Sequence, residues 1–347
     1  MTLLETRQAE LALVDRFHGA VIPAHPMALD GQGRLDVTSQ RALTRYYLAA
    51  GATGLAVGVH TTQFELHLDQ TLLRDVWQLA AETAQGVGDP LLVAGVAGDV
   101  DQAIAEAETA RELGYEAVLL SSWGMSDRGD DATITRARAV GEVLPIIGFY
   151  LQESVGGRLL GADFWRRLFD LPSVVAVKTA PFDRYRTNTV VRTLLEHERW
   201  DQVAVLTGND DAIVADLVTP YRHSGREIRA TGGLLGQWAV GTRAAARLVA
   251  EATAAVAGGS VPNELLALGA DLVEVNAAVF DVLHDFAGCV PGVNEVLRQQ
   301  GLVQTASVLG PDRLSPGQAG LIAQVRDSYP DLLDEDFVAE NKDDWLS

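Results

Sequence analysis

Short runs of β-branched and other apolar residues alternate along this 347-residue chain with longer stretches in which apolar residues recur every three or four positions. Such runs are typical of buried strands and such stretches of amphipathic helices, so the alternation indicates successive strand–helix–strand units. Eight runs are candidate strands: Ala20–Pro23, Gly54–Val59, Leu91–Val96, Ala117–Ser121, Ile146–Tyr150, Val174–Lys178, Val203–Thr207 and Ile228–Thr231. Eight such units, spaced by about 25 to 35 residues, predict a (β/α)8 barrel.

An open, doubly wound sheet is the alternative α/β fold, but it usually has fewer strands and a glycine-rich phosphate loop after the first one. Here the first candidate strand leads into HPMALDGQGRLD, whose Gly31 and Gly33 lie in a polar turn and not at a helix start. We therefore predict a TIM barrel of the α/β class with a C-terminal helical extension.

Four segments are expected along the chain. Residues 1–17 form a helical segment, residues 18–258 the barrel, and residues 259–330 a helical layer packed on the barrel. Residues 331–347 are strongly acidic and are expected to be a solvated tail. No linker rich in Pro, Gly or Ser separates these segments into independent domains.

Charge and composition exclude several classes of partner. The formal net charge is −20, which repels nucleic-acid phosphates and anionic lipid surfaces. No apolar run approaches the roughly 18 residues of a membrane span, and the charged N-terminal segment does not resemble an export signal. The single cysteine, Cys289, has no partner for an internal disulfide and is expected to be a buried apolar residue. A cytoplasmic location is expected.

Active sites of such barrels lie at the C-terminal ends of the strands, and Lys178 is the most unusual residue at one of these ends. It follows Val174–Val177, so its ammonium would emerge among apolar neighbours, where desolvation lowers the pKa of an amine. A free amine attacks carbonyl groups, whereas an ammonium does not. The alternative is a lysine that extends to solvent or pairs with a carboxylate.

Other polar residues follow neighbouring strands. Tyr150 ends the preceding strand, where its phenol would relay protons near Lys178 or simply plug the barrel mouth. Thr61 and Thr62 follow the second strand, in a loop whose N–H groups and hydroxyls are suited to a carboxylate.

These residues together resemble the dihydrodipicolinate synthase and N-acetylneuraminate lyase family of pyruvate aldolases and related lyases. The resemblance runs from about His18 to about Ser328 and rests on segments that occur in family order: VIPAHPMALDGQGRLD, GVHTTQFE, IIGFY, VVAVKTA, VLTGNDD and PGVNEVLRQQGLV. The separation between Tyr150 and Lys178 also matches the family.

The resemblance implies a Schiff base between Lys178 and the ketone of a 2-oxo acid such as pyruvate, with no metal and no organic cofactor. It also implies that Thr61 and Thr62 hold the carboxylate and that Tyr150 moves protons. Gly208 resembles the glycine that leaves room for substrate beside the reactive lysine. Members are usually homotetramers, so we expect a homo-oligomer, either a dimer or a tetramer.

Departures from the family pattern concern the substrate. His60 replaces the first glycine of the usual GTTGE loop, where it would touch substrate or support the loop. The Asn-Val-Pro sequence after the tyrosine is absent, and Arg158 is displaced from the position of the substrate-binding arginine. Trp123 stands where the synthases have paired tyrosines; it would stack on a substrate or serve as a lid or interface residue.

We therefore expect a lyase, an aldolase or hydro-lyase, that acts on a small 2-oxo acid such as pyruvate or a 2-keto-3-deoxy sugar acid and is not a dihydrodipicolinate synthase. A catalytically altered binding or sensory protein is the first alternative, supported by the changed threonine loop. A metal-dependent aldolase is the second, for which His60, Asp210 and Asp211 are the available ligands.

Overall fold

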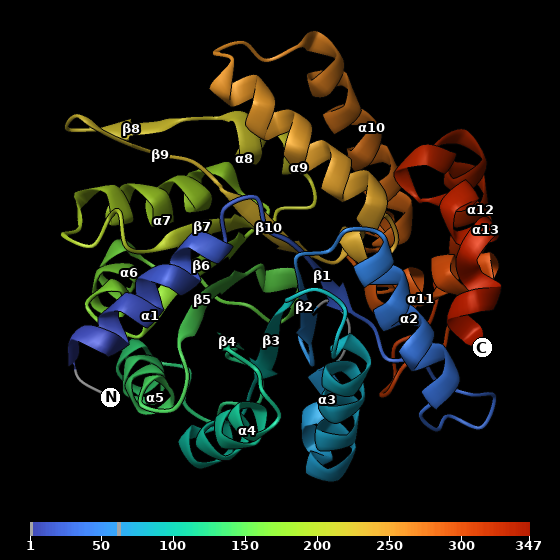
Figure 1. The fold of residues 1–347 in the computed structure, drawn as a ribbon, viewed down its shortest axis with the longest axis horizontal. Coiled ribbons are helices and arrows are strands. Elements are labelled where there is room, and N and C mark those ends of the chain that lie inside the picture. Colours follow the sequence, from blue (N-terminus) through green and yellow to red (C-terminus); the bar gives the residue numbers. More distant parts are fainter. Residues whose placement is uncertain (1–2, 61–63) are drawn as a thin grey trace.

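The computed structural model describes residues 3–60 and 64–347 and confirms the predicted barrel. Eight parallel strands close in the order β1-β10-β7-β6-β5-β4-β3-β2, and helices surround them (Figure 1). The barrel strands are β1 (Val21–His25), β2 (Gly54–Val57), β3 (Leu91–Val96), β4 (Ala117–Leu120), β5 (Ile146–Leu151), β6 (Val174–Ala180), β7 (Ala204–Thr207) and β10 (Gly232–Leu235).

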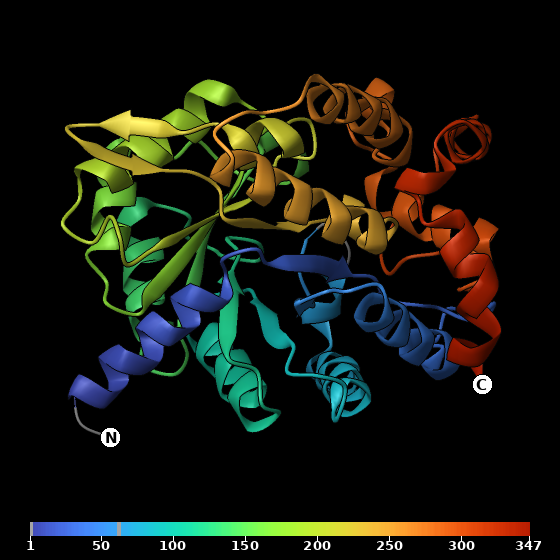
Figure 2. The same ribbon diagram turned by 45° about the horizontal axis from the view of Figure 1, so that its top comes forward.

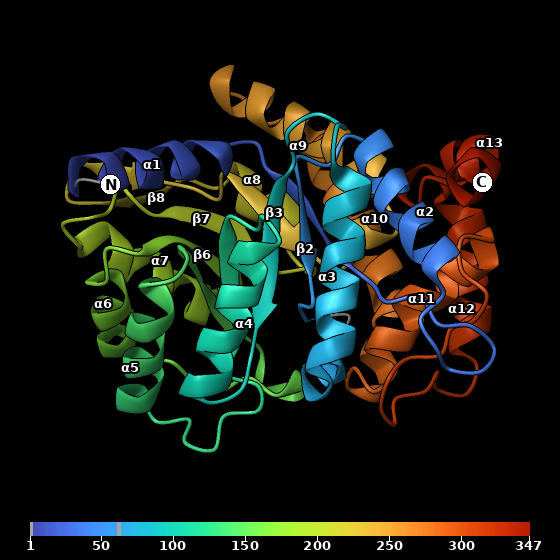
Figure 3. The same ribbon diagram turned by 60° about the horizontal axis from the view of Figure 1, so that its bottom comes forward.

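A helix follows each barrel strand. These helices are α2 (Val37–Ala49), α3 (Gln70–Ala84), α4 (Val100–Glu112), α5 (Asp130–Gly141), α6 (Ala162–Phe169), α7 (Arg184–Glu196), α8 (Ile213–Val218) and α9 (Thr242–Ala257). Asp36, Asp69 and Asp183 begin α2, α3 and α7, because each carboxylate accepts hydrogen bonds from backbone N–H groups of the first turn. A further helix, α1 (Leu3–Arg16), lies across the end at which the strands begin (Figure 3). Its Val14 packs with the residues of the barrel interior.

The C-terminal helices lie on the side of the molecule opposite the N-terminus (Figure 2). They are α10 (Asn263–Val279), α11 (Cys289–Gln300), α12 (Gln318–Ser328) and α13 (Glu335–Leu346). Helix α10 packs against α8 and α12, so this layer is joined directly to the barrel helices. None of the helices in residues 3–60 and 64–347 is both long and apolar enough to cross a membrane. The predicted segment boundaries stay a prediction.

The eighth barrel strand lies later in the sequence than predicted. Ile228 ends β9 (Arg226–Ile228), which forms an antiparallel hairpin with β8 (Tyr221–His223), and the barrel is closed by Gly232–Leu235 instead. A Cβ atom on Gly232 would lie 2.5 Å from the backbone oxygen of Ala20, so the close approach of β10 to β1 requires glycine. Because glycine is disfavoured in strands, a prediction from β propensity selects the neighbouring isoleucine.

The acidic C-terminal segment is a packed helix and not the expected solvated tail. Helix α13 lies against α2, and the ring of Trp345 lies 5.3 Å from that of Tyr46. Asp343 and Asp344 are exposed on the same helix, whereas Val338 and Trp345 are buried. The high charge of the segment concealed this amphipathic pattern.

Replacing the buried tryptophan of α13 tests this packing. We expect Trp345→Ala to lower the free energy of unfolding by about 3 kcal/mol or more, because it leaves a cavity between α13 and α2. Urea denaturation followed by circular dichroism measures the change. The exposed Asp343→Ala is the control and should change stability by less than about 0.5 kcal/mol; equal, small effects of both substitutions would contradict the packing.

Candidate active site

Lys178 lies on β6 with its side chain inside the barrel end. Only 3% of the residue is exposed, and its Nζ atom lies 4.6 Å from the centre of the Phe149 ring. Burial lowers the pKa of Lys178 to about 8, although the charge of Asp210 acts to raise it. At pH 7 about a tenth of this amine is therefore unprotonated and able to attack a carbonyl carbon, far more than for an ordinary lysine.

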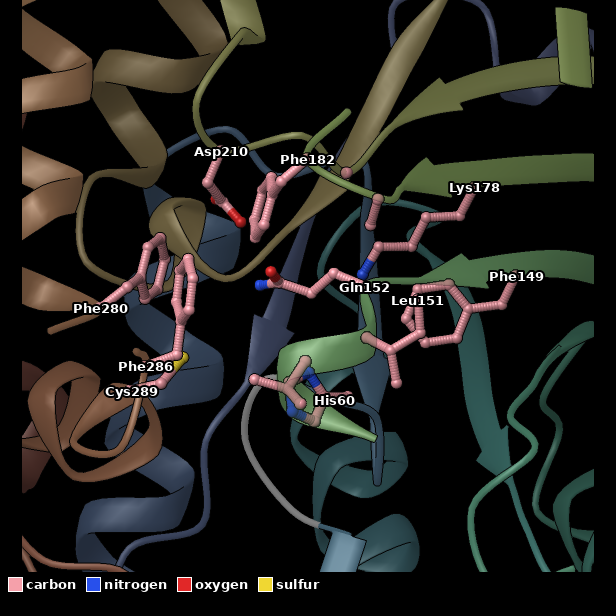
Figure 4. Close-up of a pocket in the computed structure, with 13 residues that line it drawn as sticks. His60, Phe149, Leu151, Gln152, Lys178, Phe182, Asp210, Phe280, Phe286 and Cys289 are labelled. Atoms are coloured by element: carbon pink, nitrogen blue, oxygen red, sulfur yellow. The ribbon is translucent and has the colours of Figure 1, made fainter. Parts of the chain in front are cut away.

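Lys178 lines a cavity at the carboxyl ends of β5, β6 and β7 (Figure 4). The remaining lining residues are His60, Phe149, Leu151, Gln152, Val155, Ala180, Phe182, Gly208, Asp210, Phe280, Phe286 and Cys289. Gly208 follows β7 directly beside the lysine, as predicted. A Cβ atom there would lie 2.5 Å from Cε of Lys178, so the glycine is what allows the lysine side chain its position.

Asp210 is the buried carboxylic acid of this cavity, and it was predicted only as a possible metal ligand. Its carboxylate and the amine of Lys178 point into the same space (Figure 4). Burial raises the pKa of Asp210 to about 7, although Lys178 and a hydrogen bond from the backbone N–H of Gln237 act to lower it. The pKa values of the two groups are close, so both groups change protonation state near neutral pH. The position of Asp210 just after β7 was the sequence signal for this role.

A β-bulge turns Tyr150 away from the lysine. Ile146 pairs with Val174 but Ile147 pairs with Ala176, so β6 contains one extra residue and Phe149, not Tyr150, lies opposite Lys178. The Tyr150 ring packs 5.5 Å from that of Trp165 on the outer side of the barrel. The prediction that its phenol lies near Lys178 is wrong for this structure, because a shift of one residue moves a side chain to the other face.

The Tyr150 hydroxyl has a partner elsewhere. It accepts a hydrogen bond from the backbone N–H of Leu160 at 3.3 Å. Burial raises the pKa of Tyr150, although this hydrogen bond acts to lower it. The phenol therefore helps to hold the chain between β5 and α6.

His60 lines the lysine cavity, whereas Trp123 supports it from outside. Burial, together with the charge of Lys178, lowers the pKa of His60 to about 3, so the imidazole is neutral at neutral pH. The ring of Phe64 lies 4.8 Å from His60 and 5.5 Å from Trp123, on which it stacks. Trp123 is therefore connected to the cavity through two other rings and, within the described residues, is not part of its wall.

The remaining predicted residues have different positions. Thr61 and Thr62 lie outside the described residues, so their role stays a prediction. Arg158 forms an ion pair with Asp130 at 2.8 Å and lines a separate cavity outside β5. Cys289 is buried as expected but also forms part of the lysine cavity, and burial raises the pKa of its thiol.

An outer cavity continues from the lysine cavity toward the surface and shares with it Gln152, Phe182, Asp210, Phe280 and Phe286. Its other walls combine apolar residues with the polar residues Glu153, Asp183, Arg186, Asp211 and Asn276. Within residues 3–60 and 64–347, no group of three or more His, Cys, Asp or Glu side chains is placed to hold a metal ion.

Asn276, which lines the outer cavity, has a buried side-chain oxygen that accepts no hydrogen bond in the described structure. Its Nδ2 donates to the backbone oxygen of Asp210 at 2.7 Å, whereas Oδ1 has no hydrogen-bond partner in the described structure. A buried acceptor without a donor is unfavourable, and a ligand with a hydroxyl group would satisfy it.

Comparison with known sequences gives a partial match. No model of a known protein family matches the chain. The 4-hydroxy-tetrahydrodipicolinate synthases of Bifidobacterium longum strains DJO10A and NCC 2705 are each 26% identical to it over 168 residues, which are 48% of this chain and 54% of the relative. The chain thus spans about half the length of the curated relatives it matches.

Comparison with solved structures covers nearly the whole chain. Dihydrodipicolinate synthase from Aquifex aeolicus has a TM-score of 0.71 at 18% identity, over 91% of this chain and 99% of that one. N-acetylneuraminate lyase from Fusobacterium nucleatum, complexed with pyruvate, has a TM-score of 0.71 at 15% identity, over 90% and 98%. These low identities show a shared fold. Together with the sequence match, they confirm the predicted resemblance to the dihydrodipicolinate synthase and N-acetylneuraminate lyase family.

The reactivity of the Lys178 amine should depend on pH around its lowered pKa. We expect its acetylation by acetic anhydride to increase with pH with a midpoint at about 8. Asp210→Asn should move the midpoint to lower pH, because it removes the negative charge that favours the ammonium form. The sequence contains only two lysines, so peptide mass spectrometry separates Lys178 from Lys342. A midpoint near the ordinary lysine value of about 10.4 would contradict the burial of this amine.

Proposed function

We propose that this chain is a lyase that forms a Schiff base between Lys178 and a small 2-oxo acid. The observation that carries the proposal is the buried amine of Lys178, whose pKa is lowered to about 8 inside a cavity at the carboxyl end of a closed barrel. An unprotonated amine in such a place is a nucleophile for a ketone.

Asp210 supplies the proton transfers in this proposal. When the amine attacks the ketone carbon, the Asp210 carboxylic acid gives a proton to the carbonyl oxygen, and its carboxylate then takes a proton from the nitrogen of the adduct. The acid returns this proton to the hydroxyl, which leaves as water while the nitrogen lone pair forms the iminium. In an aldolase the iminium then accepts the electron pair of the carbon–carbon bond that breaks. In a hydro-lyase it accepts the pair of the neighbouring C–H bond, whose proton passes to the Asp210 carboxylate, and the resulting enamine expels a hydroxyl that this acid protonates to water. The raised pKa of Asp210 suits both the donation and the return of a proton near neutral pH.

The outer cavity indicates the distal part of the substrate. Asp211 and Asn276 line this space with acceptor-bearing side chains, and burial raises the pKa of Asp211. Hydroxyl groups of a substrate chain would donate to acceptors of this kind, whereas the free carboxylate of aspartate semialdehyde has no proton to donate to them. We therefore propose a 2-keto-3-deoxy sugar acid, not the substrate of a dihydrodipicolinate synthase.

Reduction with borohydride in the presence of pyruvate tests the Schiff base. We expect a stable adduct on Lys178, because borohydride reduces an iminium to a secondary amine. Intact-mass and peptide spectra locate the adduct; Lys342→Ala should retain it and Lys178→Ala should lose it. An adduct on Lys342, or none at all, would remove the proposed mechanism.

Turnover of hydroxylated 2-oxo acids tests the role of Asp210 separately. We expect Asp210→Asn to lower kcat by about 10²- to 10⁴-fold, because the general acid is lost, while the borohydride adduct with pyruvate still forms but more slowly, because Lys178 remains. Tyr150→Phe removes only a hydroxyl that lies outside the lysine cavity, so kcat should change by less than about threefold. The measurement is pyruvate release or water loss across a panel of sugar-derived, aromatic and simple 2-oxo acids.

The outcomes of this panel separate the alternatives. A large loss of kcat in Tyr150→Phe, together with full activity in Asp210→Asn, would mean that Tyr150 and not Asp210 transfers the protons. Efficient condensation of pyruvate with aspartate semialdehyde would contradict the proposed substrate. Silence across the panel together with no adduct would favour the binding or sensory protein. The expected homo-oligomer and cytoplasmic location stay predictions.

A further inference from the structure

A second cavity lies on the outer side of β5, beneath α5 and α6. It has a volume of about 30 Å³, enough for two water molecules or one compact ion. Apolar side chains form most of its wall, and its polar lining residues are Ser122, Thr133, Arg136 and Arg158. It shares Phe149 and Leu151 with the lysine cavity, so the two spaces lie on either side of β5.

Arg136 is unusual in this cavity because it is a buried cation with few hydrogen-bond partners. The residue is 0% exposed, and its Nε atom has no hydrogen-bond partner in the described part of the chain. Its terminal nitrogens make only long contacts, 3.6 Å to Sδ of Met125 and 3.4 Å to the backbone oxygen of Val96. Such a contact set is weak for a group with five N–H donors.

The two acidic residues whose charges act on Arg136 are occupied by other donors. Glu106 accepts hydrogen bonds from the backbone N–H of Ala97 and from Gln102, and it contacts the imidazole of His67. Asp99 accepts from the backbone and side chain of Ser126. Both carboxylates act on Arg136 from a distance, but among the described residues none forms an ion pair with it.

The guanidinium nevertheless stays charged. Burial lowers the pKa of Arg136 to about 10, although Glu106 and Asp99 act to raise it, and this value still lies well above neutral pH. A buried cation without a direct counterion is destabilising, and a ligand of opposite charge would offset that cost. Arg158 does not need one, because it pairs with Asp130 at 2.8 Å.

We propose that this cavity binds one compact monovalent anion, of the size of chloride or formate. Nε of Arg136 would donate to the anion. Ser122 is a second donor, since its Oγ atom accepts from Arg128 and its hydroxyl proton is free to point into the cavity. The small volume and apolar walls exclude a hydrated dianion such as phosphate. This site is independent of the Schiff base at Lys178.

Thermal unfolding in matched sodium salts tests the site. At equal ionic strength, chloride or formate should raise the unfolding midpoint above that in gluconate, which is too large to enter, and the rise should saturate with concentration. Arg136→Gln should abolish this difference. Arg138→Gln is the matched control, because it removes the same charge from an exposed position on the same helix and should keep the full response.

A second variant keeps the test valid if Arg136→Gln does not fold. Ser122→Ala removes one donor without adding volume and should weaken the apparent affinity for chloride by about tenfold. Equal midpoints in chloride, formate and gluconate for the unmodified chain would mean that the cavity holds only water, and would overturn the proposal. An unchanged chloride response in both Arg136→Gln and Ser122→Ala would do the same.

Discussion

The arrangement of residues at this end of the barrel depends on the burial of the Lys178 amine. Lowering its pKa from 10.5 to about 8 corresponds to about 3 kcal/mol of differential free energy between the two protonation states. Gly208 provides the space for the lysine stem, Phe149 covers the amine on one side, and Asp210 provides a charge that partly offsets the desolvation. The closed sheet and its helices hold these groups in place, so the free energy of folding maintains a nucleophile that water would keep protonated.

Periodicity predicted the parts of the fold that depend on one dominant signal. Seven of the eight barrel strands were located because β-branched residues, which favour strands, also form the core of the barrel. The eighth strand was missed because its first two residues are Gly232 and Gly233, selected for close contact and not for strand propensity. Helix α13 was missed because acidic residues such as Asp343 and Asp344 outweigh, in composition, the few apolar residues that pack. In both cases the deciding interaction joins residues far apart in the sequence.

The candidate site shows the same division. Lys178, Gly208 and His60 meet in one cavity because the carboxyl ends of parallel strands share one edge of the barrel, a rule that needs no coordinates. Tyr150 does not lie in this cavity, because the rule predicts at which end of a strand a residue lies but not on which side of the sheet its side chain points. The single extra residue at Val175 changes the pairing of β5 with β6, so that Phe149 and not Tyr150 lies opposite Lys178. Local sequence does not reveal a bulge of this kind, since Val175 is an ordinary strand residue. The aromatic walls contributed by Phe280 and Phe286 come from the segment between α10 and α11, and no feature of the sequence pointed to them.

The contact between α13 and α2 has a consequence for how the chain folds during its synthesis on the ribosome. Arg45 on α2 donates hydrogen bonds to the backbone oxygens of Trp345 and Ser347, and the first of these bonds joins residues 300 positions apart. At typical rates of synthesis, roughly 15 to 60 seconds separate the appearance of the two partners. During that interval Tyr46 lacks the helix that later covers it, so the nascent chain exposes an apolar surface early in its synthesis. Chaperones that recognise exposed aromatic surface would therefore encounter this chain at its N-terminal third, long before its barrel is closed.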